Sequence, residues 1–235
     1  MTRARTAFGA EFLGAEGFLN SPTYGLPPTF LTDELRDCIG AWQAGTMDAP
    51  SFDEPVRRGR AGYAALAGVP VESVVMGGSV SAVLGLVAQA GRGVTVTELT
   101  ADELVAAASG YDGVIASVVQ SANGHVLDVD ALRDAVAGTN TLVVLDVTQS
   151  MGWKQLDLGW ADVTATAVYK WLLAPRGTAW MSLSERVSGL MTPHAANWYG
   201  ARSRGRRSTG RRCGSPRVRA GSTRRRPGSG PWARG

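Results

Sequence analysis

The chain has 235 residues, 44% of them hydrophobic, so it can bury the core of one large domain or two small ones. This composition excludes wholesale disorder. The formal net charge of +4 joins two unlike parts, because residues 1–201 carry 12 Lys and Arg against 20 Asp and Glu, whereas residues 202–235 carry 12 Arg and no acidic residue. The body therefore has a charge of −8 and the final segment a charge of +12.

Cysteine and hydropathy patterns restrict the expected compartment. Cys38 and Cys213 are the only cysteines, which is too few for a disulfide framework. No apolar run approaches the length of a membrane span, and the N-terminus lacks the long apolar segment of a signal peptide. His and Cys are too few and too scattered to predict a metal site. We therefore expect a soluble, cytoplasmic protein with no membrane partner.

In chain order, residues 1–60 are loop-rich around LNSPTYGLPP and helical over Asp33–Trp42, which predicts an N-terminal arm and cover helix. Beyond them, short segments rich in Val, Thr and Ala alternate with helical stretches. The predicted strands are Ser73–Met76, Val94–Leu99, Gly113–Val119, Thr141–Val147, Val163–Val168 and Thr178–Leu183, and the predicted helices are Ser79–Ala90, Ala101–Ala108 and Asp130–Ala137. This alternation predicts an α/β domain over residues 61–201, with a mostly parallel sheet flanked by helices.

Ligands of such sheets bind at the carboxyl ends of the strands, where two glycine-containing turns fall. In MGGSVSAVLGL a strand ends near Gly78 and a helix begins at Ser79, so free backbone N–H groups could bind a phosphate. The same pattern is common in plain turns before capped helices, and it matches neither GxGxxG nor the P-loop. In SVVQSANG, Gln120 and Ser121 could face a ligand or only form the turn that Asn-Gly favours.

Two further strand ends carry chemically distinctive side chains. In LVVLDVTQS a strand ends at Asp146, whose carboxylate could pair with a protonated ring nitrogen or cap the turn, and the amide of Gln149 follows. Another strand runs into Tyr169 and Lys170. Lys170 and Lys154 are the only lysines beside 22 arginines, so a lysine here suggests chemistry that Arg cannot perform, such as a Schiff base. A solvated surface lysine is the alternative.

Together the GGSVS helix start, LDVTQS and YKWLLAPRG resemble the class V aminotransferase family, over roughly residues 16–200. These pyridoxal 5'-phosphate (PLP) enzymes of fold type I include cysteine desulfurases and isopenicillin N epimerase-like proteins. The resemblance implies a PLP-dependent enzyme that acts on an amino acid, with homodimeric relatives. It implies that Lys170 is catalytic, binding PLP as a Schiff base and moving a proton at the substrate α-carbon, while Asp146 pairs with the pyridine nitrogen.

The resemblance also assigns the remaining site positions. It implies that the phosphate is bound at Gly78, Ser79, Val80 and Tyr169, the ring oxygen at Gln149, the cofactor or substrate at Ser121, and that the substrate pocket is bordered by Asn20 and Tyr24. The cofactor is expected to be PLP, and no metal is expected.

The sequence departs from the family in two places. Relatives place a further strand and helix, with a side chain that stacks on the pyridine ring, where residues 89–93 make a direct link, so we infer an internal deletion of about one βα unit. After Ala201, where relatives continue into a small domain that usually supplies an Arg for the substrate carboxylate, residues 202–235 are an Arg/Gly/Ser/Pro segment. We expect this segment to be disordered and interpret it as an out-of-frame product, which would make the chain a truncated member with impaired activity.

Other functions remain open at this stage. The Arg-rich segment could bind nucleic acid through charge alone, but with Trp232 as its one aromatic residue it predicts no specific nucleic-acid partner. The chain could instead be a non-catalytic scaffold. Within the family, a desulfurase needs a catalytic Cys on a mobile loop, and neither Cys38 nor Cys213 is placed for that role.

Overall fold

The computed structural model describes residues 4–14, 16–82, 84–85 and 101–191. The chain divides into Met1–Thr192 and Pro193–Gly235, and every described residue belongs to the first unit. The predicted strand Val94–Leu99, the second half of the predicted helix Ser79–Ala90, the expected deletion at residues 89–93 and the Arg-rich segment at residues 202–235 lie outside the described residues.

The N-terminal part begins with a hairpin that sequence patterning did not predict. Strands β1 (Ala4–Ala7) and β2 (Ala10–Leu13) pair in antiparallel fashion. Phe8 and Gly9 join them with positive φ angles of 52° and 74°, as in the two-residue turns that match strand twist. Helix α1 (Thr29–Gln43) follows and confirms the helix predicted at Asp33–Trp42, although it begins earlier, at Thr29, and buries no residue.

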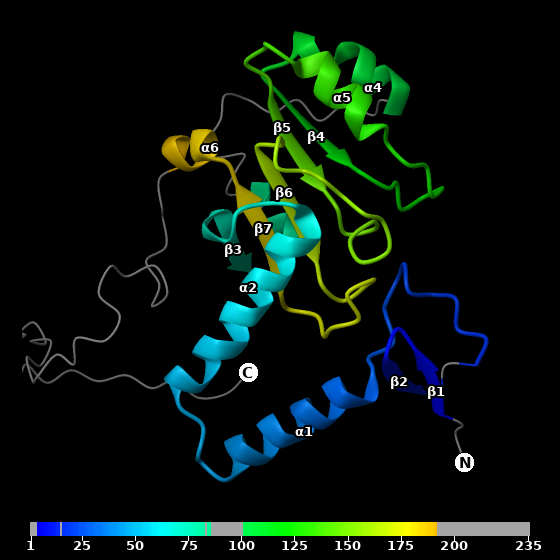
Figure 1. The fold of residues 1–235 in the computed structure, drawn as a ribbon, viewed down its shortest axis with the longest axis vertical. Coiled ribbons are helices and arrows are strands. Elements are labelled where there is room, and N and C mark those ends of the chain that lie inside the picture. Colours follow the sequence, from blue (N-terminus) through cyan, green and yellow to red (C-terminus); the bar gives the residue numbers. More distant parts are fainter. Residues whose placement is uncertain (1–3, 15, 83, 86–100, 192–235) are drawn as a thin grey trace, which may run out of the picture. The chain divides into compact units, whose positions relative to one another are not determined.

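Helix α2 (Asp53–Ala67) was also missed, because Gly59, Gly62 and three arginines interrupt its apolar pattern. It follows a 3-10 turn (Ala49–Phe52) in which the side chain of Asp48 accepts the backbone N–H of Ser51. It ends at Gly68, which has a left-handed φ of 67°. The boundary expected between residues 60 and 61 lies inside this helix, which packs against the central sheet (Figure 1).

The central sheet has the strand order β3-β7-β6-β5-β4. Its strands are β3 (Val74–Gly77), β4 (Gly113–Ser117), β5 (Leu142–Asp146), β6 (Val163–Ala167) and β7 (Ala179–Leu183), which confirm five of the predicted strands. Strands β4, β5 and β6 pair in parallel, whereas β7 is antiparallel to both β6 and β3. The segment between β6 and β7 contains no helix, and a parallel crossover needs about a dozen residues or more, usually helical.

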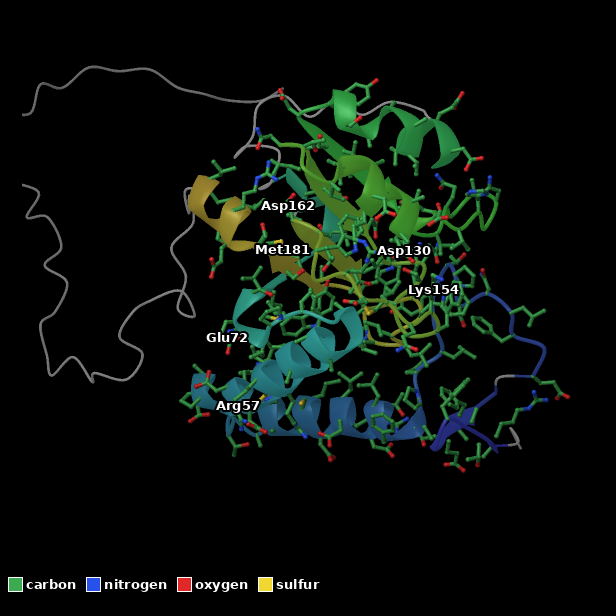
Figure 2. The ribbon with its side chains drawn as sticks, turned by 45° about the horizontal axis from the view of Figure 1, so that its top comes forward. Arg57, Glu72, Asp130, Lys154, Asp162 and Met181 are labelled. Atoms are coloured by element: carbon green, nitrogen blue, oxygen red, sulfur yellow. The ribbon has the colours of Figure 1, made fainter. Side chains whose placement is uncertain are left out.

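Helices cover both faces of this sheet, as predicted. Alternate residues of β5 point to opposite faces, so Val143 and Leu145 belong to one buried cluster and Val144 to the other. Helices α4 (Ala101–Ala107), α5 (Val129–Val136) and α6 (Glu185–Leu190), with 3-10 turns at Val71–Ser73 and Ala108–Gly110, complete the described elements. Leu132 of α5 joins the first cluster, and Val187 of α6 joins Met181 of β7 (Figure 2) in the second. The fold class is therefore α/β, with a mixed, mostly parallel sheet.

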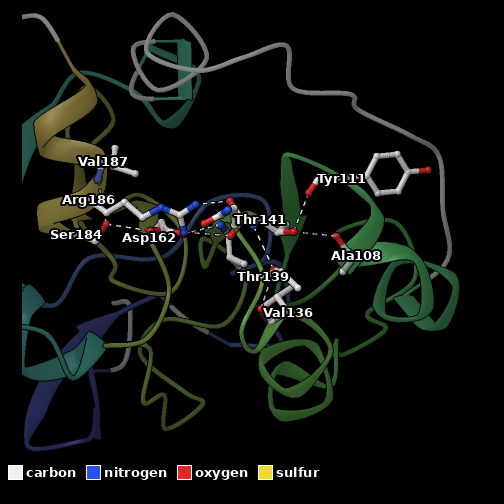
Figure 3. A network of polar contacts seen from close by, with 11 residues as sticks. Ala108, Tyr111, Val136, Thr139, Thr141, Asp162, Ser184, Arg186 and Val187 are labelled. Carbon is white, nitrogen blue, oxygen red and sulfur yellow. Dashed lines mark hydrogen bonds and ion pairs between the residues drawn. The ribbon is translucent and has the colours of Figure 1, made fainter.

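A polar network fixes the edge of the sheet at which β5 and β6 begin (Figure 3). The carboxylate of Asp162 accepts hydrogen bonds from the Val143 backbone N–H (2.9 Å) and the Ser184 hydroxyl (3.1 Å). It also pairs with Arg186 at 3.6 Å, and Arg186 donates to the Thr141 carbonyl oxygen at 3.4 Å. The network ties α6 to the starts of two strands and leaves the opposite edge, where those strands end, free to form a site.

Within residues 4–14, 16–82, 84–85 and 101–191, no helix is both long enough and apolar enough to span a bilayer. The same residues contain no group of three or more His, Cys, Asp or Glu side chains that could hold a metal ion.

Candidate active site

A cavity of about 400 Å³ lies where β4, β5 and β6 end. Every residue predicted to hold the cofactor lines it: Gly78, Ser79, Val80, Ser121, Asp146, Gln149, Tyr169 and Lys170. These residues come from four segments that are distant in sequence, and the parallel pairing of β4, β5 and β6 brings three of the segments to one edge. The remaining lining residues are Ser81, Leu84, Ser117, Val119, Thr148, Ala167, Arg176, Gly177 and Thr178.

Asp146 is the last residue of β5 and lies in register with Ser117 of β4. One carboxylate oxygen, Oδ1, accepts the backbone N–H of Thr148 at 2.8 Å. The hydroxyl of Thr148 in turn accepts the N–H of Ala167 at 3.1 Å, which links the turn after β5 to the end of β6. Among the described residues the other oxygen, Oδ2, has no hydrogen-bond partner, so it can accept a hydrogen bond from a ligand.

Lys170 lies in the turn after β6 and is partly buried. Burial lowers the pKa of Lys170, because a desolvated ammonium group is disfavoured, and the nearby Arg176 cation lowers it further. The carboxylate of Asp146 opposes this by raising the pKa of Lys170. The direction of the resulting shift favours the neutral amine, which is the nucleophilic form.

The helix start at residues 78–80 shows the capped turn that the sequence allowed, and its place in the cavity is compatible with the predicted phosphate site. The hydroxyl of Ser79 accepts the backbone N–H of Ala82 at 3.1 Å, so Ser79 caps the helix. Gly78 and Val80 nevertheless line the cavity beside it. A Cβ on Gly78 would meet nothing within 4 Å, so crowding does not require glycine there. The first turn of a helix leaves N–H groups without internal partners, which suits this position to an anion.

Gln149 makes hydrogen bonds to three other residues through its side chain and its backbone. Its Nε2 donates to the carbonyl oxygen of Pro22 at 3.1 Å, and its Oε1 accepts the indole N–H of Trp171 at 3.0 Å. The backbone oxygen of Gln149 accepts the indole N–H of Trp153 at 2.7 Å. One N–H of the Gln149 amide remains for a ligand. The amide also connects the N-terminal segment, through Pro22, to the turn after β6 that carries Lys170 and Trp171.

The two predicted substrate residues are placed differently. Neither Asn20 nor Tyr24 lines the cavity. The carbonyl oxygen of Asn20 accepts backbone N–H groups of Thr23 and Tyr24, which closes a turn. Tyr24 then packs on the ring of Tyr169, with centroids 5.8 Å apart, and thereby supports the cavity wall.

Sequence reasoning missed Arg176, which is the second cationic side chain of the cavity. Its guanidinium carbon lies 4.2 Å from the ring centroid of Tyr169 and 5.6 Å from that of Tyr24. The residue belongs to the YKWLLAPRG motif, six positions after Lys170. That short spacing, within the turn that carries Lys170, was the sequence signal that could have placed Arg176 in the cavity.

Comparison with known proteins finds relatives of this chain by sequence and by structure. No family model matches the chain. Isopenicillin N epimerase of Amycolatopsis lactamdurans is 33% identical over 131 residues, which cover 53% of this chain and 31% of the epimerase. The apo cysteine desulfurase of Thermococcus onnurineus NA1 superimposes with a TM-score of 0.62 at 16% identity, over 75% of this chain and 56% of that one.

The cystine C–S lyase C-DES, in complex with cysteine persulfide, gives a TM-score of 0.63 at 17% identity, over 76% of this chain and 60% of C-DES. In the structure of a lysine-to-alanine mutant of C-DES, glycine is covalently linked to the PLP cofactor. The chain has the fold of the class V aminotransferases. These findings confirm the resemblance predicted from the sequence, and the chain spans about a third of the epimerase and just over half of the two enzymes of known structure.

The cavity fits PLP in the chemistry of its side chains. PLP carries an aldehyde, a pyridine nitrogen and a phosphate, and the cavity provides an amine, a carboxylate with a free oxygen and a helix start. Leu84, Val119 and Ala167 add apolar lining, as a ring requires. The expected deletion at residues 89–93, which would remove a ring-stacking side chain, lies outside the described residues.

Proposed function

We propose that this chain is a PLP-dependent enzyme of the class V aminotransferase type that acts on an amino acid through Lys170. The observation that carries the proposal is the meeting of Lys170 and Asp146 in one cavity, at the edge where parallel strands end. The lowered pKa of Lys170, which follows from its burial, supports a nucleophilic amine. The structures of C-DES and of the cysteine desulfurase support the cofactor through their shared fold.

When bound, PLP would supply an electron sink joined to the amino-acid substrate. Lys170 would hold the aldehyde carbon of the cofactor and, after the substrate amine takes its place, would receive or return a proton at the substrate α-carbon. Asp146 would accept a hydrogen bond from the protonated pyridine nitrogen through Oδ2, the oxygen left free by Thr148. The helix start at residues 78–80 would bind the phosphate.

The experiment uses the fact that Lys154 and Lys170 are the only lysines of the chain. Purified protein is titrated with PLP while its visible absorbance is recorded, then reduced with borohydride and digested for mass spectrometry. We expect the pyridoxyl group on Lys170, and we expect its loss in Lys170→Ala. Lys154→Ala is the matched control, because Lys154 (Figure 2) does not line the cavity. A wild-type protein that takes up no PLP would support the scaffold alternative instead.

We also propose that the chain works as a homodimer. Helix α1 carries Leu35, Ile39 and Trp42 yet buries no residue among those described, and 74% of the Trp42 surface is exposed. A helix with an uncovered apolar face of this kind favours association. Light scattering during size-exclusion chromatography should give twice the chain mass, and Trp42→Ser should reduce that mass toward the monomer. A monomeric wild-type protein would refute the proposal.

For localisation we propose the cytoplasm. Cys38 is free and exposed, in keeping with a reducing compartment. Cell fractionation with immunodetection should recover the chain with cytosolic markers, and recovery in a secreted or membrane fraction would contradict this.

A further inference from the structure

The turn between β6 and β7 places two cations in the same cavity. It closes on itself, because the N–H of Val168 donates to the carbonyl oxygen of Thr178 at 3.4 Å and the N–H of Ala174 donates back to Val168 at 3.1 Å. Lys170 and Arg176 both belong to this closed turn and both line the cavity. The charge of Arg176 acts on Lys170 strongly enough to contribute to its lowered pKa.

Two tyrosine rings hold the guanidinium group of Arg176. Its central carbon lies 4.2 Å from the ring centroid of Tyr169 and 5.6 Å from that of Tyr24. A cation above an aromatic ring is attracted by the ring face, and this contact does not consume the N–H donors in the guanidinium plane. Arg176 is thus positioned while its five N–H donors stay available for an oxyanion.

Arg176 also has no carboxylate partner of its own. Across residues 4–14, 16–82, 84–85 and 101–191 it makes no ion pair and no hydrogen bond. Arginines that do pair with a carboxylate in the same part of the chain are Arg5, Arg36, Arg57, Arg58, Arg133 and Arg186. A positioned arginine with unused donors in a cavity is prepared for an anionic ligand, because less side-chain freedom is lost on binding.

We propose that Arg176 binds the carboxylate of the amino-acid substrate, an inference that rests on the proposed function. In an amino acid one carbon separates the amine from the carboxylate, so neighbouring cavity positions must take the two groups. Lys170 is the position at which the amine is exchanged, and Arg176 lies in the same closed turn. The planar guanidinium can bind a carboxylate through two parallel hydrogen bonds. The cofactor phosphate, the other oxyanion of the site, is left to the helix start at residues 78–80.

The test compares two probes on the PLP-loaded full chain. L-alanine and ethylamine both carry an amine and a methyl group, but only L-alanine has a carboxylate. Their dissociation constants are measured from the change in visible absorbance in wild type, Arg176→Gln and Arg176→Lys. The matched control is Arg58→Gln, which removes one positive charge from an exposed position on α2 outside the cavity. The dissociation constant of PLP itself is measured for each variant.

We expect Arg176→Gln to weaken L-alanine binding by about 10- to 100-fold, the usual range for a lost charge-assisted contact. Binding of ethylamine and PLP should change by less than about threefold, which is about half of a tenfold step on the logarithmic scale. Arg176→Lys should retain part of the L-alanine affinity, and Arg58→Gln should match wild type.

Three results would overturn the proposal. Weaker PLP binding in Arg176→Gln, with the preference for L-alanine over ethylamine intact, would assign Arg176 to the phosphate. Equal losses for L-alanine and ethylamine would assign it a structural role. Failure of the wild-type chain to bind PLP would refute the proposed function itself, and this inference with it.

Discussion

The backbone N–H of Gly25 donates to the carbonyl oxygen of Tyr169 at 2.8 Å, directly before Lys170 in the chain. No side chain fits at Gly25, because a Cβ there would clash with the carbonyl oxygen of Lys170 and lie 2.6 Å from Cδ2 of Leu173. The close approach also sets the place of Tyr24, whose ring packs on Tyr169. The N-terminal segment therefore forms part of the wall that positions Lys170.

The first prediction concerns this approach. Gly25→Ala should push the N-terminal segment away from the lysine turn, because backbone atoms of that turn cannot yield cheaply. We expect the dissociation constant of PLP to rise by about tenfold or more, equivalent to at least about 1.4 kcal/mol. Gly40→Ala is the control, since a Cβ at Gly40 would meet nothing within 4 Å. Equal PLP affinity in the two variants would contradict the proposed coupling.

The second prediction concerns the pH dependence of Lys170. Burial lowers the pKa of Lys170, Asp146 raises it and Arg176 lowers it. Asp146→Asn should therefore move the pKa of Lys170 further down, because the carboxylate that stabilises the ammonium is lost. Arg176→Gln should move it up, because a neighbouring cation is removed.

These opposite shifts are measurable without bound cofactor. The rate of reductive methylation of Lys170 follows the fraction of its neutral amine. Mass spectrometry measures this rate from about pH 6 to 11, the range in which lysine amines titrate. Its midpoint should fall in Asp146→Asn and rise in Arg176→Gln. Methylation of Lys154 in the same samples controls for the reactivity of the reagent, because Lys154 does not line the cavity. Midpoints that moved in the same direction would show that altered burial, not charge, dominates.

The third prediction concerns the edge of the sheet opposite the cavity. Asp162→Ala would leave the N–H of Val143 and the charge of Arg186 without their partner in a largely buried position. We expect a loss of about 2–4 kcal/mol in the free energy of unfolding, measured by urea denaturation. Asp33→Ala, which breaks an exposed pair with Arg36, should cost less than about 0.5 kcal/mol. The PLP affinity should be unchanged in both variants. A loss of PLP affinity in Asp162→Ala alone would show that the Asp162 edge of the sheet is coupled to the edge that carries the cavity.

Most of the site was predictable because chemistry was concentrated at strand ends. The ends of β5 and β6 were identified from apolar runs that stop at Asp146 and just before Lys170, and parallel pairing then brings these residues together. Arg176 was not predictable in the same way. Its position depends on the ring of Tyr24, which lies far away in sequence and reaches the cavity wall only through the close approach at Gly25.

The direction of β7 and the presence of helix α2 escaped for different physical reasons. The reversed direction of β7 depends on the length and closure of the turn after β6, and the apolar pattern of Ala179–Leu183 is the same for either direction. Helix α2 escaped because Gly59 and Gly62 resemble breakers in the sequence. In the structure only one of them has a reason to be glycine.

The last prediction separates these two glycines of α2. A Cβ at Gly59 would lie 2.6 Å from Cζ2 of Trp180, a buried side chain of β7, whereas a Cβ at Gly62 would meet nothing within 4 Å. Gly59→Ala should destabilise the protein by about 1–2 kcal/mol, since overpacking outweighs the gain in helix propensity. Gly62→Ala should stabilise it by about 0.5–1 kcal/mol. Urea denaturation measures both. If both variants were stabilised, Trp180 would have yielded, and packing on the sheet would not select the glycine at position 59.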